Sequence, residues 1–171
     1  MMRPIVGTLI EIASLAALLG LSSFVPPGLS FGLYVIVAEL MATYLVHCPA
    51  HYVVGSLVGI RFRSLRLGKT TLAMVMPARL AGLTRWFPIL TLSTIKTSLA
   101  NVSKRRVAMM YRAGTFASVS SALVIAAAAT SVEPLLYAGL AWAIALGYLV
   151  FDLVFSPRSG DLSKARATLL A

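Results

Sequence analysis

Charged side chains are scarce in this chain of 171 residues, where they make up only 12% of the total. Hydrophobic residues make up 59%, and the mean hydropathy is +0.90. So little charge is unusual for a soluble domain of this size. Apolar stretches of about 20 residues that cross a bilayer are the simpler explanation. The composition therefore predicts an integral, multi-pass membrane protein.

Acidic residues are rarer still, since five stand against 15 lysines and arginines for a formal charge of +10. In a soluble protein this balance would suggest nucleic acid binding. Here the basic residues cluster between apolar segments, which is typical of a topology signal and of contact with anionic headgroups. We therefore expect the lipid bilayer, and no nucleic acid, as their partner. Cysteine is almost absent, and the single Cys48 excludes an internal disulfide.

Four apolar segments have the length of membrane-spanning helices, at about residues 5–25, 31–60, 107–130 and 134–155. The first is expected to be a retained span and not a cleaved signal peptide, because Glu11 interrupts it and SSFVPPG is a poor cleavage site. The expected fold class is an all-α polytopic membrane protein, with the whole chain forming a single membrane domain.

The segment 61–106, between the second and third predicted helices, holds most of the positive charge. Its first part, IRFRSLRLG, alternates apolar and basic residues with the period of two that is typical of a strand with one wet face. The apolar pieces that follow are too short or too charged to span. We expect an interfacial or re-entrant segment, containing a short β-hairpin, with RWFP (85–88) as an interfacial anchor.

The charges between the predicted helices indicate an orientation. The loop PPGLS is neutral and the turn SVEP is acidic, whereas the segment 61–106 and the tail after residue 155 are basic. Four spans place both basic stretches and Arg3 on one side of the membrane. By the positive-inside rule, both termini are expected to be cytoplasmic.

The stretch LVHCPAH (45–51) contains both histidines of the chain and lies inside the second predicted span. On a helix, His47 and His51 lie about 40° apart on one face. His-Glu-x-x-His helices present two imidazoles to one Zn²⁺ with this separation. Two imidazoles inside an apolar span are costly without a partner, so the spacing favours a metal site over two unrelated core histidines. Haem is disfavoured, because its axial ligands approach from opposite faces.

Three segments, in order along the chain, carry a resemblance to a known family. They are HCPAHYVVGSLVGIRFRSLRLG (47–68), SKRRVAMMYRAGTFAS (103–118) and FDLVFSPRSGDL (151–162). They resemble the metal-binding helix with its following strand, the Ala-Gly-Pro-x-Ala-Asn helix entry and the Leu-Asp-Gly segment of the site-2 protease family of intramembrane zinc metalloproteases. The departures are Cys48 for the catalytic Glu, Thr115 for Pro, Ser118 and Asp152 for Asn, and Gly160 before Asp161 instead of after it.

The resemblance implies a zinc site formed by His47, His51 and Asp161, with Asp152 as the alternative third ligand. Asp161 has a competing interpretation as a helix N-cap, an ordinary role for Asp after Gly. Cys48 occupies the catalytic position of the family's glutamate, which activates the zinc-bound water. A thiol is shorter than Glu, ionises near pH 8.5 and prefers to coordinate a metal, so it is a poor substitute base.

Other carboxylates could replace that glutamate only if folding brings them close. Glu39 lies about 12 Å along the helix axis from His47, and Glu11 lies on another helix. Three interpretations stay open: a non-proteolytic site-2-protease-like protein that binds metal or transmembrane helices of substrate or partner proteins, an active intramembrane metalloprotease with an unusual base, and a membrane subunit or scaffold of a larger complex. The missing glutamate favours the first.

Overall fold

Four long helices dominate the computed structural model, which describes residues 2–26, 28–68, 89–132 and 135–170. They are α1 (Pro4–Gly20), continued by a 3₁₀ turn η1 (Leu21–Phe24), α2 (Leu29–Leu57), α5 (Lys104–Val132) and α6 (Leu135–Ser159). Each is long and apolar enough to cross a membrane, so the four helices predicted from hydropathy are confirmed in the described part of the chain. Two shorter helices are α4 (Lys96–Ala100) and α7 (Asp161–Leu170).

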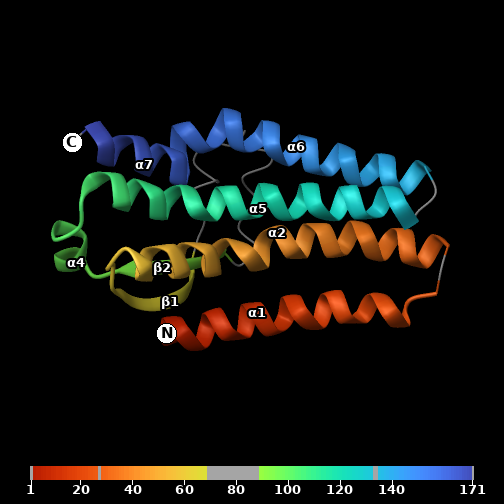
Figure 1. Ribbon diagram of the computed structural model, residues 1–171, viewed down its shortest axis with the longest axis horizontal. Coiled ribbons are helices and arrows are strands. Elements are labelled where there is room, and N and C mark those ends of the chain that lie inside the picture. Colours follow the sequence, from red (N-terminus) through yellow and green to blue (C-terminus); the bar gives the residue numbers. More distant parts are fainter. Residues whose placement is uncertain (1, 27, 69–88, 133–134, 171) are drawn as a thin grey trace.

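The long helices lie side by side in chain order, α1 against α2, α2 against α5 and α5 against α6 (Figure 1). Small side chains between α2, α5 and α6 let their backbones approach closely. The buried residues of this interface are Val35, Ala122, Ala126, Ala129, Ala141 and Ala145. The outer faces expose large apolar side chains, such as Leu9, Val124 and Leu153. This distribution is the one expected of helices surrounded by lipid.

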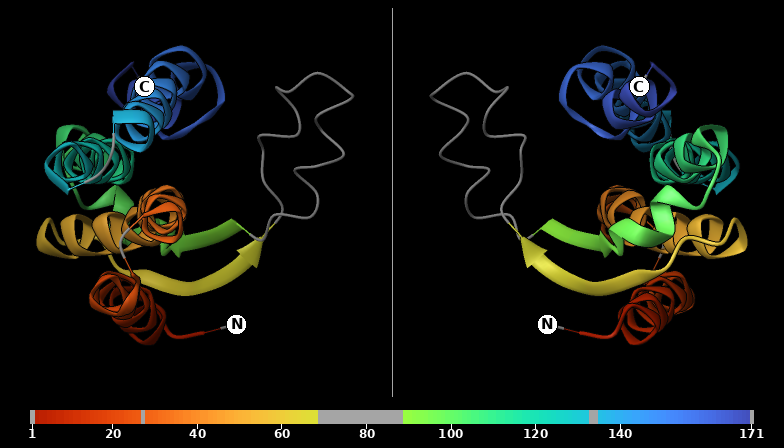
Figure 2. Two further views of the ribbon diagram at one scale, coloured as in Figure 1. Left: turned by 90° about the vertical axis from the view of Figure 1, so that its right-hand side faces the viewer. Right: turned by 90° about the vertical axis from the view of Figure 1, so that its left-hand side faces the viewer.

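A two-stranded antiparallel sheet lies to one side of the helices (Figure 2), with β1 (Phe62–Gly68) paired to β2 (Ile89–Thr94). A backbone bridge joins Met2 to Leu65 on the other edge of β1. The strand predicted from IRFRSLRLG is therefore present. Because residues 69–88 separate the two strands, they do not form a short hairpin. RWFP and the apolar piece before it lie outside the described residues.

The end of α2 lies at Leu57, three residues before the end expected from hydropathy, for a local reason. Gly59 has a φ of +91°, a left-handed conformation that favours glycine. The N–H of Ile60 donates to the Gly55 carbonyl (2.8 Å), and the N–H of Gly59 donates to the Ser56 carbonyl (3.1 Å). These two bonds form a Schellman motif, which stops the helix although the apolar run continues.

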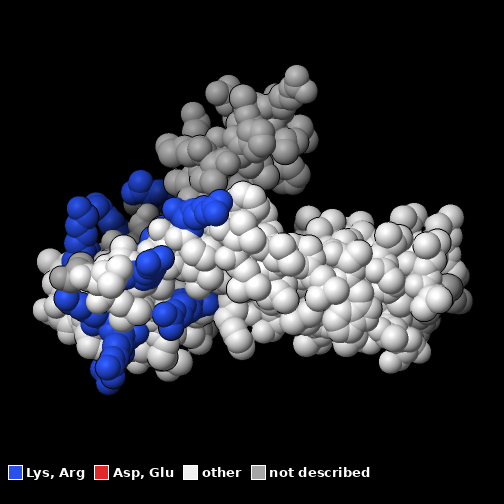
Figure 3. Space-filling view, turned by 90° about the horizontal axis from the view of Figure 1, so that it is seen from above, with Lys and Arg blue, Asp and Glu red and all other residues white. Residues whose placement is uncertain are grey.

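Lysine and arginine side chains gather at one end of the bundle, whereas the other end shows no charged side chain in the view of Figure 3. The basic end carries β1, α4 and α7, and the first and last described residues also lie there (Figure 1). The two ends of the chain therefore share one side of the helix bundle, as the four predicted spans require.

Candidate metal centre

Two histidines of α2 and one aspartate of α7 meet inside the bundle. The Nε2 atoms of His47 and His51 lie 3.2 Å apart, and Asp161 Oδ2 lies 3.0 Å from the first and 2.9 Å from the second. Tetrahedral Zn²⁺, with bonds of about 2.0–2.1 Å, holds its ligand atoms about 3.3 Å apart. The three donor atoms therefore form a group that could hold a metal ion, with nearly the spacing that zinc requires.

Helices α2 and α5 together position the imidazoles. α2 continues through Pro49, so His47 and His51 keep the one-turn spacing that places them on one face. Gly114 of α5 lies directly against His51, and a Cβ added there would be 2.6 Å from His51 Cε1 and 2.7 Å from its Cδ2. Glycine is therefore the residue that leaves room for this imidazole between the two helices.

Asp161 reaches the histidines because the chain turns sharply between α6 and α7. α6 runs to Ser159, beyond the predicted end at 155, with Pro157 near its end. The next residue, Gly160, packs so closely on α6 that a Cβ would lie 2.7 Å from Ser156 Oγ and 3.0 Å from Ser156 Cα. The glycine before the aspartate thus permits the turn that directs the carboxylate back toward α2.

Each carboxylate oxygen of Asp161 contacts a nitrogen atom of a neighbouring side chain. Oδ2 faces His47 and His51, and Oδ1 accepts a hydrogen bond from Lys164 Nζ at 2.9 Å. Burial by itself raises the pKa of this carboxyl, but in the metal-free site hydrogen bonds from His47 and His51, which require a proton on Nε2, and the charge of Lys164 hold the pKa well below its usual range. α7 begins at Asp161 itself, and these side-chain contacts favour the ligand interpretation over the N-cap.

Hydrogen bonds behind the imidazoles assign their tautomers. His51 Nδ1 lies 2.7 Å from the Met110 carbonyl, which only accepts, so Nδ1 carries the proton. His47 Nδ1 lies 3.1 Å from Ser118 Oγ, and that hydroxyl donates its single proton to the Thr43 carbonyl at 2.7 Å. Ser118 therefore accepts from His47. Both imidazoles hold their protons on Nδ1 and turn the Nε2 lone pairs toward Asp161.

This arrangement calls for a cation at its centre. Two Nε2 lone pairs and one carboxylate oxygen approach one another within 3.2 Å. Without a positive charge between them these groups repel, because none of the three carries a proton to share. A proton on one imidazole relieves part of this repulsion, and a divalent ion relieves all of it. The site is therefore chemically suited to Zn²⁺, whose protein ligands are commonly imidazole and carboxylate.

A cavity of about 120 Å³ opens beside the three donors and is lined by His47, Asp161 and also Asp152. Asp152 does not belong to the group of donors that could hold one ion, so Asp161, and not the alternative, completes that group. Asp152 Oδ2 is buried and has no hydrogen-bond partner in the described part of the chain.

Cys48 is buried and does not belong to the group of three donors. Its thiol lies 3.4 Å from the carbonyl oxygen of Leu90 on β2, to which it donates. Glu11 lies on α1 and is also buried. Glu39 is fully buried within the bundle, and neither glutamate belongs to the donor group.

Sequence reasoning found the three donors but missed several residues that support them. Lys164 lies in no motif, and the segment 103–118, which contains Met110 and Gly114, gave no sign that these two residues contact His51. Only the contacts with His51 and Asp161 show their roles. Comparison with known proteins adds no identification, because no family model, no curated protein and no solved structure matches this chain. The class of site therefore follows from geometry: an imidazole–imidazole–carboxylate centre between three helices.

Proposed function

We propose that this chain is an integral membrane protein with four spans that binds Zn²⁺ through His47, His51 and Asp161, as in the site-2 protease family. The observation that carries the proposal is the donor triangle, in which both Nδ1 atoms are occupied and both Nε2 atoms face the carboxylate. The four apolar helices and the basic end of the bundle support membrane insertion, with both termini on the cytoplasmic side. Anionic headgroups are the partners of that basic end.

The protein is proposed to bind metal, or transmembrane helices of other proteins, without cutting them. Hydrolysis of the family type needs a carboxylate one residue after the first histidine to accept a proton from the metal-bound water. Cys48 stands there, and its thiol is engaged with the Leu90 carbonyl. The usual base is therefore missing, and no other residue on the same helix turn replaces it.

One observation favours a second candidate, an active intramembrane metalloprotease with Asp152 as the proton acceptor. Asp152 lines the cavity next to His47 and Asp161 and has a buried, unpartnered oxygen. Incubation with a model transmembrane substrate separates the candidates: cleavage by the wild type that is lost in Asp152→Asn, with zinc retained, supports the second, and absence of cleavage supports the first.

Metal content tests the proposal directly. We expect elemental analysis of detergent-purified protein to find about one zinc per chain, and much less in His47→Ala and Asp161→Ala. Asp152→Asn is the matched control, since it changes a neighbouring aspartate outside the donor triangle and should keep the metal. A wild-type protein that stays free of zinc after exposure to it, or equal zinc in the His47→Ala variant, contradicts the assignment.

A further inference from the structure

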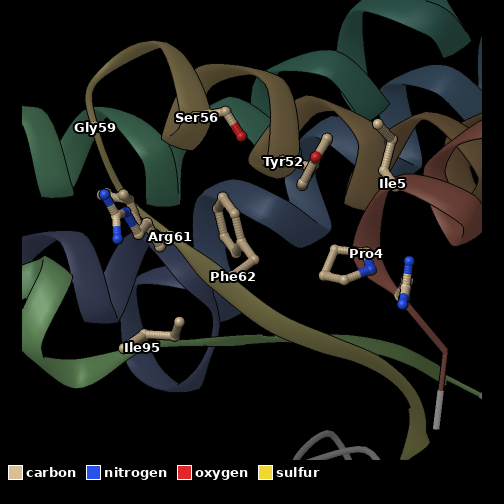
Figure 4. Close-up of a pocket in the computed structure, with 10 residues that line it drawn as sticks. Pro4, Ile5, Tyr52, Ser56, Gly59, Arg61, Phe62 and Ile95 are labelled. Carbon is tan, nitrogen blue, oxygen red and sulfur yellow. The ribbon is translucent and has the colours of Figure 1, made fainter.

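A second cavity, distinct from the metal centre, lies at the basic end of the bundle. It has a volume of about 670 Å³ and is bounded by the start of α1, the last turns of α2 and the first residues of β1 (Figure 4). Volumes of this size are typical of small-molecule sites. The metal donors do not line it, and neither the sequence motifs nor the proposed metal chemistry account for it.

The floor of this cavity is apolar and its walls carry hydroxyl groups. Phe62 lies in the middle, and its ring packs against Tyr52 with centroids 5.4 Å apart. Ile5 reaches the cavity from α1 and Ile95 from the chain after β2, while Ser56 directs its hydroxyl toward it from α2 (Figure 4). Such a surface accepts hydrocarbon along one side and hydrogen-bonding groups along the other.

Two arginines line the cavity, one at each place where a span meets the basic end. Arg3 directly precedes α1, and Arg61 follows the end of α2. Every ion pair in the described part of the chain involves Asp161, so neither guanidinium is neutralised by a carboxylate there. An unneutralised pair of arginines at the level of the headgroups is an anion-binding feature.

The backbone holds this cavity in shape without a ligand. The N–H and carbonyl of Met2 both bond to Leu65 at 3.1 Å, which ties the residue before Arg3 to β1. The N–H of Arg61 donates to Ser98 Oγ at 2.9 Å, and its carbonyl accepts from the N–H of Ile95 at 2.9 Å. Both arginines therefore project from fixed backbone, which lowers the entropy cost of binding.

We propose that this cavity binds one anionic phospholipid, with its phosphate between Arg3 and Arg61 and an acyl chain over Phe62 and Ile5. The two arginines favour an anion by charge complementarity. The apolar floor adjoins the exposed apolar side chains at the start of α1, and it therefore favours an amphiphile over a free anion. The inference rests on the proposed membrane insertion, but it is independent of the metal.

Retention of defined lipids by native mass spectrometry tests the proposal. Delipidated protein is mixed with phosphatidylglycerol or with phosphatidylcholine of the same chain length, and bound lipids are counted. We expect one phosphatidylglycerol to be held in preference to phosphatidylcholine. Each of Arg3→Gln and Arg61→Gln should weaken this binding about fivefold, the equivalent of about 1 kcal/mol per arginine near a headgroup.

Two further variants distinguish a specific lipid site in the cavity from general attraction of anionic lipid to the basic end. Arg166→Gln removes an exposed arginine of α7 that does not line the cavity and should leave retention unchanged. Ser56→Trp fills the cavity without altering charge and should abolish it. Equal losses in all three arginine variants, equal retention of phosphatidylcholine, or displacement of the lipid by inorganic phosphate overturns the proposal. Protein that needs no detergent to stay in solution would instead overturn membrane insertion, on which the inference rests.

Discussion

Replacement of Gly114 by alanine tests the metal centre through a residue that binds no metal. The added Cβ would lie 2.6 Å from His51 Cε1, whereas carbon atoms in contact are about 3.5 Å apart, so α5 or the imidazole must move by about 0.9 Å. Zinc–ligand distances tolerate shifts of only about 0.2 Å. The substitution therefore displaces one ligand of three from its position.

We expect Gly114→Ala to weaken zinc binding by about 100-fold, the upper end of the effects seen when groups that position metal ligands are changed. Overpacking at this contact should also lower the free energy of unfolding by about 1–3 kcal/mol. Titration against a chromophoric zinc chelator measures the affinity in detergent, and circular dichroism on heating measures the stability.

Gly139→Ala is the matched control, because Gly139 lies within α6 and a Cβ there meets no atom within 4 Å. It should leave zinc affinity unchanged and stabilise the helix by up to about 1 kcal/mol. A folded Gly114→Ala protein that binds zinc as tightly as the wild type would refute the reasoning, since His51 could then not be a ligand in the described position.

Three further predictions concern the same centre. Ser118→Ala removes the acceptor that fixes the His47 tautomer, so zinc affinity should fall about 10- to 100-fold in the chelator titration while Ser121→Ala, one turn along α5, has no effect. Cys48→Glu restores a base and should confer cleavage of a model transmembrane substrate; no cleavage with zinc bound and substrate present would count against a simple loss of the base. Despite its burial, Asp161 has a lowered pKa in the metal-free site, because Lys164 and imidazoles that carry a proton on Nε2 donate to its carboxylate. These contacts stabilise the metal-free fold when the pH is above about 4, the ordinary pKa of an aspartate, and the stabilisation is lost as the pH falls below it. The difference in melting temperature between the wild type and Asp161→Asn should therefore shrink below about pH 4, and a difference that stays constant would argue against this origin.

The two candidate functions differ in whether any carboxylate acts as a proton acceptor beside the three donors. Cys48 follows the first histidine, whereas Asp152 of α6 lines the cavity beside His47 and Asp161. Cleavage assays on Asp152→Asn and Cys48→Glu in parallel therefore test the two positions separately.

Hydropathy and residue periodicity were enough to predict most of the architecture. Four apolar segments of sufficient length became α1, α2, α5 and α6, because in such segments the backbone satisfies its hydrogen bonds most simply as helix. The alternation in IRFRSLRLG predicted β1. The strand that pairs with β1 could not be located in advance, since residues 69–88 intervene and pairing across such a distance depends on tertiary packing.

The sequence by itself determined that two imidazoles share one helix face, because a spacing of four residues does so on any α-helix. It also showed that a cysteine, Cys48, and not a glutamate follows the first of them. The tertiary structure alone decided that Asp161, and not Asp152, completes the donor group, and that Cys48 faces the Leu90 carbonyl. Those outcomes depend on the turn at Gly160 and on the packing of α5 and β2 around α2, which bring together residues more than 100 positions apart, such as His47 and Asp161.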